Sequence, residues 1–302
     1  MTKSPRSAAN NISLMLNTVL GADRFERGPV NVAELALEYT KQIEPSSHIE
    51  RIVADDLPDC EGALVPGESK PRRWAIMYNR KQSAGRRAYT IAHELGHFVL
   101  HRNLVDDDPN FDGGFYCSKD AVEHGVGRNI EKEANEFAAT LLMPLDDFRK
   151  FIPSDNPAGL DRLGEATERY GVSLTAATLR WLEYTTTRAI AIASVDGFAL
   201  WAKSSDAAFK SGRFIRTKNE LFELPAASMA VRKEFGEDSV TGIPQAAGVW
   251  FPEPAIEMCM RTDRYDFELT LLHFEGKAPA WQAEDELEDA YTQFFKIAEP
   301  RH

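Results

Sequence analysis

The segment that most constrains this chain is Arg87 to His101, which contains the run His93-Glu94-Leu95-Gly96-His97. Apolar residues recur along the segment three or four positions apart, which predicts an amphipathic helix packed against a core. These residues are Ala88, Ile91, Ala92, Leu95, Phe98 and Val99. A helix places two imidazoles four positions apart on one face, which is the spacing that holds a divalent metal ion.

On such a helix His93 and His97 lie about 40° apart around the axis, and Glu94 lies about 60° beyond His97. We therefore expect His93 and His97 to bind one metal ion, with Glu94 beside it as the base. The alternative is an exposed helix whose histidines have no role, and the apolar stripe argues against it. Gly96 weakens the helix interior, so we expect another backbone to approach closely there.

A catalytic zinc site takes three protein ligands and leaves one position open. His101 follows His97 by four residues, but it lies about 12 Å along the helix axis from His93. That distance is too great for both to bind one ion. The third ligand should come from another segment.

A second amphipathic helix is predicted from Asn129 to Met143, before Pro144. Its stripe consists of Ile130, Ala134, Phe137, Ala138, Leu141 and Leu142. Glu131 falls on this inward face, whereas Glu133 and Glu136 fall outside it. A buried carboxylate is costly unless it is paired or bound to a metal, so Glu131 is the expected third ligand.

Asn135 follows Glu131 by one turn, where it can orient His93 or His97; a plain surface asparagine is the alternative. An oxyanion donor is also expected, and Tyr116, His124 and Tyr89 are candidates by residue type only. Residues 102–129 read as a long loop, rich in Asp and Gly. Its acidic residues are expected to form a solvated surface rather than metal ligands.

The rest of the chain predicts a mixed α+β protein. Helices are expected at Ile12 to Leu20 and Val30 to Gln42, without the basic surface of a DNA-reading helix-turn-helix. Strands are expected at Ile49 to Ala54, Gly62 to Val65 and Trp74 to Tyr78. The last of these either lies along the cleft, where an extended substrate adds as a further strand, or is an interior strand.

Residues 188–302 are expected to form a smaller α+β module after a first domain of residues 1–187. Asp196-Gly197 predicts a hairpin between Ala189 to Val195 and Phe198 to Trp201. Further strands and a closing helix are expected at Val249 to Phe251, Ile256 to Met260, Phe267 to Phe274 and Glu284 to Phe295. His273 is expected in the core or at a sheet edge. The module is a sensor, a substrate-docking domain or a structural extension.

Composition narrows the classes of function. The net charge of −12 argues against general nucleic-acid binding, which depends on clustered Lys and Arg. Three distant cysteines without a CxxC pair favour neither a disulfide framework nor a thiolate zinc site. No signal peptide or transmembrane span is read at the N-terminus, so we expect a cytoplasmic protein. A digestive protease is disfavoured for the same reason.

The motif around His93, the trailing His101 and the run Glu131-Lys-Glu-Ala-Asn-Glu-Phe-Ala-Ala-Thr-Leu-Leu-Met-Pro144 resemble the ImmA/IrrE family of bacterial metallopeptidases. The resemblance implies a zincin-like fold and a zinc-dependent endopeptidase, with manganese as the alternative metal. It assigns metal binding to His93, His97 and Glu131 and the base to Glu94. It also implies a protein substrate, a helix-turn-helix transcriptional repressor whose cleavage switches on stress or mobile-element genes.

Two other classes of function stay open at this stage. In the first, the protein is a regulatory protein that binds a metal as a sensor without cleaving peptides. In the second, it is an antitoxin-like or DNA-binding regulator, which the acidic balance disfavours. Binding to a membrane is not expected, and the oligomeric state is not determined by the sequence.

Overall fold

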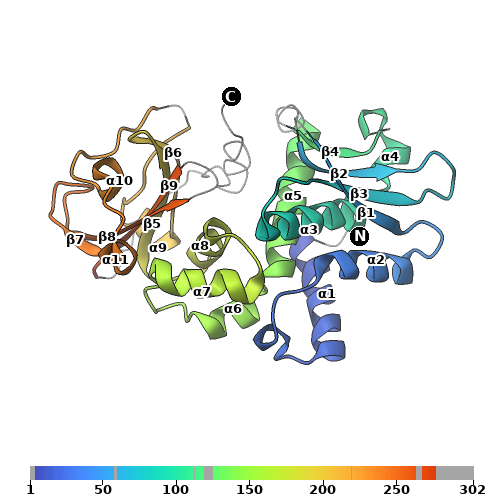
Figure 1. The fold of residues 1–302 in the computed structure, drawn as a ribbon, viewed down its shortest axis with the longest axis horizontal. Coiled ribbons are helices and arrows are strands. Elements are labelled where there is room, and N and C mark those ends of the chain that lie inside the picture. The colour runs from blue at the N-terminus through green and yellow to red at the C-terminus, as the bar shows by residue number, and fades with distance from the viewer. Residues whose placement is uncertain are drawn as a thin grey trace. The chain divides into compact units, whose positions relative to one another are not determined.

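The computed structural model describes residues 4–57, 60–111, 113–118, 125–218, 220–262 and 267–276 (Figure 1). The chain divides into two compact units, Met1–Leu145 with Thr167–Ser173, and Asp146–Ala166 with Leu174–His302. Helices and sheets occur in both, which confirms the α+β class. The division into domains of residues 1–187 and 188–302 stays a prediction.

The first unit contains a four-stranded sheet with the order β1-β3-β2-β4. Its strands are β1 (Ile49–Asp55), β2 (Cys60–Pro66), β3 (Trp74–Asn79) and β4 (Phe115–Ser118). β1 runs parallel to β3, while β2 is antiparallel to both β3 and β4. The three expected strands are confirmed.

One sequence expectation about this sheet is wrong, and an alternative that the sequence left open is decided. The segment read as one long loop contains β4, along with the short helices α4 (Leu104–Asp107) and η2 (Pro109–Phe111). Moreover, β3 pairs with β1 on one side and with β2 on the other. Because both edges of β3 are occupied, it is an interior strand and cannot receive a substrate as a further strand.

The helices of the first unit are α1 (Pro5–Leu20), η1 (Arg24–Glu26), α2 (Val32–Ile43), α3 (Ala84–His101) and α5 (Gly125–Leu142). Ser83 caps α3, and its hydroxyl accepts a hydrogen bond from the Arg86 amide. α3 is more buried than the apolar stripe predicts, since every residue from Tyr89 to Phe98 is buried. α3 contacts β2 and β3 as well as α5, so it lies inside the unit rather than on its surface.

Gly96 allows α3 and α5, which lie side by side in Figure 1, to approach each other closely. A Cβ at this position would lie 3.0 Å from Phe137 Cδ1 and 3.3 Å from the Cα of Ala134, both on α5. The expected close approach of another backbone is therefore confirmed. The glycine brings together the two helices that carry the candidate metal ligands.

We expect Gly96→Ala to destabilise the protein, although alanine favours helices. Overpacking a filled core costs about 1–3 kcal/mol, and over most of this range the cost exceeds the gain of about 1 kcal/mol in helix propensity. Gly164→Ala is the matched control, because no atom lies within 4 Å of a Cβ added to that helical glycine. Urea unfolding should rank Gly96→Ala below the wild type and Gly164→Ala at or above it. The reverse ranking would contradict the close packing.

The second unit contains a five-stranded antiparallel sheet with the order β6-β5-β9-β8-β7. Its strands are β5 (Arg188–Val195), β6 (Phe198–Ser204), β7 (Ile243–Gln245), β8 (Ala255–Thr262) and β9 (Phe267–Phe274). Asp196 and Gly197 both have positive φ, 50° and 82°, as the expected hairpin turn requires. The hairpin and the strands β8 and β9 are confirmed.

The remaining helices are α6 (Leu145–Phe151), α7 (Leu160–Tyr170), α8 (Leu174–Leu182), α9 (Asp206–Lys210), α10 (Met229–Arg232) and α11 (Glu237–Thr241). The strand expected at Val249 to Phe251 is wrong, since these residues form bends after a turn at Gly248, where φ is positive. The helix expected at Glu284 to Phe295 lies outside the described residues. Among the helices described, none has the length and hydropathy to cross a bilayer.

His273 is a core residue of the second unit, as expected, and gives a testable dependence of stability on pH. Its Nε2 donates a hydrogen bond to the carbonyl of Ala158 at 3.0 Å, and its ring packs on Trp181. Burial lowers the pKa of His273 from 6.5 to about 4. The folded protein therefore keeps this imidazole neutral in a pH range where the unfolded chain protonates it.

Unfolding consequently takes up a proton at His273, and stability should fall as the pH drops from 6.5 to about 4. The full effect of this group is about 3 kcal/mol. His273→Gln keeps an amide donor for Ala158 but cannot titrate, so its stability should depend less on pH. Urea unfolding of both proteins at pH 7 and pH 5 measures the difference. Equal losses of stability in the two proteins would rule out His273 as the source.

Candidate metal centre

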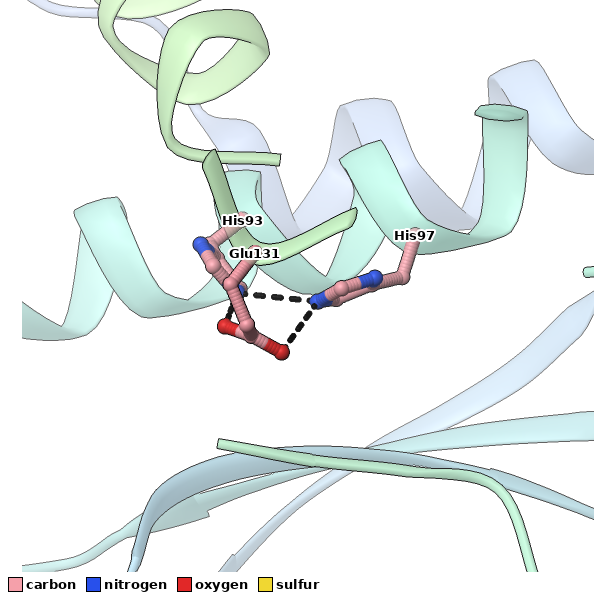
Figure 2. A group of neighbouring side chains, drawn as sticks. All are labelled: His93, His97 and Glu131. Atoms are coloured by element: carbon pink, nitrogen blue, oxygen red, sulfur yellow. Dashed lines mark hydrogen bonds and ion pairs between the residues drawn. The ribbon is translucent and has the colours of Figure 1, made fainter. Parts of the chain in front are cut away.

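Three side chains from two helices converge at one point in the first unit (Figure 2). His93 and His97 come from α3, and Glu131 comes from α5. Glu131 Oε2 lies 3.1 Å from His93 Nε2, and Glu131 Oε1 lies 3.3 Å from His97 Nε2. The two Nε2 atoms are 3.0 Å apart. All three residues are buried, with exposed fractions of 5%, 0% and 8%.

These separations fit a divalent ion. Tetrahedral zinc with bonds of about 2.0–2.1 Å places neighbouring ligand atoms roughly 3.3 Å apart. Two imidazole nitrogens and one carboxylate form a ligand set that zinc accepts, and carboxylates also suit manganese. The group of His93, His97 and Glu131 could therefore hold a metal ion.

The charges in the group follow from its burial and its close pairs. Burial tends to raise the pKa of Glu131, but the imidazoles of His97 and His93 hold it below the ordinary value. Burial lowers the pKa of His97 to about 4, so this imidazole is neutral near pH 7. Burial also acts to lower the pKa of His93, yet its hydrogen bond and attraction to Glu131 leave it raised. The group thus offers an anionic carboxylate and a neutral imidazole, and a metal would compete with protonation of His93.

Glu94 is fully buried, and its charge acts on His93, the residue before it on α3. A Cβ added to Gly62 of β2 would lie 2.9 Å from Glu94 Oε1 and 2.4 Å from Thr90 Cγ2. The backbone of β2 therefore passes close over the Glu94 carboxylate, and only a glycine leaves room for it. This contact places Glu94 between α3 and the sheet. Its role as a base stays a prediction.

Asn135 lies beside His93, as the sequence predicted. The Nδ1 of His93 is 3.0 Å from Asn135 Oδ1, which accepts the hydrogen bond. The hydroxyl of Tyr89 donates to the same oxygen at 3.3 Å. Asn135 therefore turns His93 so that its Nε2 faces His97 and Glu131. Tyr89 supports this amide rather than lying free as an oxyanion donor.

His97 is held by groups that the sequence reasoning missed. The ring of Phe115, on β4, stacks on the imidazole at a centroid distance of 4.9 Å and an angle of 9°. His97 Nδ1 lies 3.1 Å from His101 Nδ1, and His101 Nε2 lies 2.9 Å from Glu133 Oε2. His101, four residues after His97, is the sequence feature that could have indicated this support.

The candidate Tyr116 is not brought to this group. Tyr116 follows Phe115 on β4, and neighbouring side chains on a strand point to opposite faces of a sheet. Phe115 faces His97, and Tyr116 is 46% exposed. His124 lies outside the described residues. Asp106 of the acidic segment pairs with Lys70 and Arg72, in keeping with a surface role.

Comparison with known proteins matches part of this chain to a protein family. The model described as the IrrE N-terminal-like domain, of the peptidase M78 family, matches residues 47–182. A solved structure of a Mycobacterium tuberculosis transcriptional regulator is 14% identical, with 88% of this chain and 75% of that chain covered and a TM-score of 0.49. A likeness of that size supports no conclusion about function. The comparison with curated proteins gives no match.

Proposed function

We propose that the protein is a zinc-dependent endopeptidase, because residues 47–182 match the model of the IrrE N-terminal-like domain of the M78 peptidase family. The observation that carries the proposal is the group of His93, His97 and Glu131, in which two buried imidazoles and one buried carboxylate meet within this domain. Such a set provides three protein ligands, as catalytic zinc sites do.

The side chains divide the reaction between them. His93, His97 and Glu131 would hold the zinc, which when bound polarises the scissile carbonyl and lowers the pKa of a water molecule. Glu94 takes the proton from the attacking water and passes it to the leaving amine. Asn135 keeps His93 in the orientation that binds. The buried surroundings strengthen each of these electrostatic contacts.

The substrate segment is proposed to bind in an extended form beside β4. In the part of the chain that the structure describes, β4 pairs with β2 on one side only. Phe115 stacks on His97, so this strand runs next to the metal group. An added strand would form main-chain hydrogen bonds along the edge of β4. This edge replaces the strand Trp74 to Asn79 that the sequence suggested.

The proposed substrate is a helix-turn-helix transcriptional repressor in the cytoplasm, cleaved to derepress stress or mobile-element genes. The family resemblance supports this class of substrate. The net charge of −12 also supports it, because DNA-binding proteins present basic surfaces that an acidic protein attracts. The second unit is proposed to sense a signal or to dock the repressor.

The test is to incubate the purified protein with the repressor encoded beside its own gene. We expect a single chelator-sensitive cleavage, restored by added zinc and absent with Glu94→Gln. If the protein binds metal but cleaves no candidate repressor, it is instead a metal-binding sensor, which is the alternative function. Salt-dependent DNA binding by the chain would support a DNA-binding regulator and contradict the proposal.

A further inference from the structure

The two imidazoles of the metal group have different supports. His93 Nδ1 donates to a neutral amide, that of Asn135. His97 Nδ1 instead lies 3.1 Å from the Nδ1 of another histidine, His101. The chain of contacts continues from His101 Nε2 to Glu133 Oε2 at 2.9 Å. Thus His93 is hydrogen-bonded to an amide, while His97 is connected to a carboxylate through the imidazole of His101.

When His97 binds a metal, only one placement of the protons satisfies the hydrogen bonds from His97 through His101 to Glu133. A hydrogen bond between two Nδ1 atoms holds one proton, because two protons or two lone pairs facing each other repel. His97 can bind a metal through Nε2 only when that nitrogen carries a lone pair, so the neutral ring has its proton on Nδ1. His97 therefore donates to His101 Nδ1. The neutral ring of His101 then carries its proton on Nε2, which donates to Glu133.

Packing holds the imidazole rings of His97 and His101 in place. His97 and His101 are one turn apart on α3, with exposed fractions of 0% and 5%, and their ring centroids are 5.2 Å apart. Phe115 stacks on His97 and also lies against His101 at 6.3 Å. Glu133 has a side chain that is 49% exposed. Water therefore reaches this side chain, while its Oε2 contacts the buried imidazole of His101.

We propose that His101 and Glu133 are positioning residues that act through His97, fixing its tautomer and orientation and increasing its strength as a metal ligand. The inference rests on the proposed metal site. Groups that accept a hydrogen bond from a metal-binding histidine commonly contribute 10–100-fold, as an order of magnitude, to metal affinity. The sequence argues against His101 and Glu133 as metal ligands. Their contacts indicate that they orient His97 instead.

The test measures zinc affinity by competition with a chelator and needs no activity. We expect His101→Ala to weaken zinc binding by about 10–100-fold and Glu133→Gln to weaken it by a smaller factor. Glu136→Gln is the matched control, because Glu136 is a partly exposed carboxylate on the same helix that pairs with Arg6. It should bind zinc as the wild type does.

Chemical rescue separates positioning from general damage to the fold. Free imidazole should restore much of the zinc affinity of His101→Ala, since it can occupy the vacated space and accept the proton of His97. It should not improve the wild type. If His101→Ala does not fold, Glu133→Gln carries the test, because its side chain is half exposed and its loss leaves the core intact.

The outcomes distinguish this inference from the proposed function. Zinc binding by the wild type with equal affinity in His101→Ala and Glu133→Gln overturns the inference and leaves the metal site standing. Weakened binding in His101→Ala without rescue by imidazole, together with unchanged binding in Glu133→Gln, also overturns it. A wild type that binds no zinc overturns both the inference and the proposed function.

Discussion

Replacing Glu94 with Gln is expected to abolish peptide cleavage while the protein keeps its metal. Glu94 follows His93 on α3 and is not one of the three proposed ligands, so the substitution removes the base but not a metal bond. The amide has nearly the same volume and fits beneath Gly62. General bases contribute roughly 10²–10⁴-fold to rate, so kcat should fall by about three orders of magnitude. Cleavage rate and zinc content of the same preparation check this.

Glu136→Gln serves as the control for Glu94→Gln, because it removes a carboxylate from the same unit without touching the group. It should cleave at the rate of the wild type. Metal-dependent cleavage retained by Glu94→Gln would remove Glu94 from the role of base. Loss of zinc together with activity in that variant would show instead that Glu94 is needed for binding.

Glu131→Gln is expected to lose most of the metal affinity and with it the cleavage activity. Zinc binding to small structural sites is worth about 10–16 kcal/mol, or roughly 3 kcal/mol for each of four ligands. Loss of one ligand should therefore weaken binding roughly a hundredfold or more. Chelator competition measures the change, and added zinc should restore part of the activity.

The substitution of Glu131 also tests the pairing seen within the group. Without zinc, the Glu131 carboxylate raises the pKa of His93. In Glu131→Gln this imidazole should therefore titrate at lower pH. Nuclear magnetic resonance of the metal-free proteins can follow that titration. Unchanged zinc affinity in Glu131→Gln would show that the third ligand comes from another residue, and the present assignment would be wrong.

The sequence predicted the three members of the group because each depends on local geometry. The spacing of His93 and His97 on α3 is set by the helix itself. Glu131 was found because a carboxylate on the apolar face of an amphipathic helix needs a partner, and the structure supplies two imidazoles. Asn135 follows from the same helix, one turn later. Such features require only a helical period and a buried face.

The features that the sequence missed depend on contacts between distant segments. β4 is a four-residue strand whose existence rests on pairing with β2, with Leu64 opposite Phe115, and its neighbours are typical of loops. The position of β3 inside the sheet likewise depends on its partners. His101 on α3 contacts Glu133 on α5. The periodicity of one helix cannot predict a contact with a residue on another helix.

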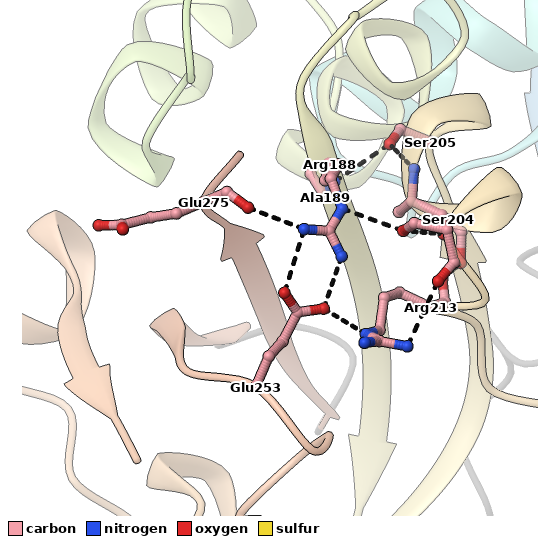
Figure 3. Close-up of polar contacts among 9 residues, drawn as sticks. Arg188, Ala189, Ser204, Ser205, Arg213, Glu253 and Glu275 are labelled. Atoms are coloured by element: carbon pink, nitrogen blue, oxygen red, sulfur yellow. Dashed lines mark hydrogen bonds and ion pairs between the residues drawn. The ribbon is translucent and has the colours of Figure 1, made fainter. Parts of the chain in front are cut away.

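The second unit gives a further example of this limit (Figure 3). Arg188 at the start of β5 donates to both oxygens of Glu253, at 3.1 and 2.5 Å, and to the carbonyl of Glu275 at 2.7 Å. Arg213 contacts the same carboxylate. The side chain of Arg188 is only 7% exposed, and the ion pair with Glu253 compensates for burying its charge. No pattern in the sequence joins residues so far apart.

The central claim is that one metal ion is held by His93, His97 and Glu131 with a position left for solvent. Diffraction from crystals of the zinc-loaded protein, recorded at the zinc absorption edge, tests it most directly. We predict a single anomalous peak about 2.0–2.2 Å from the Nε2 atoms of both histidines and from the Glu131 carboxylate, with a water molecule as a further ligand. An ion bound elsewhere, or Glu131 turned away with no ligand in its place, would contradict the account.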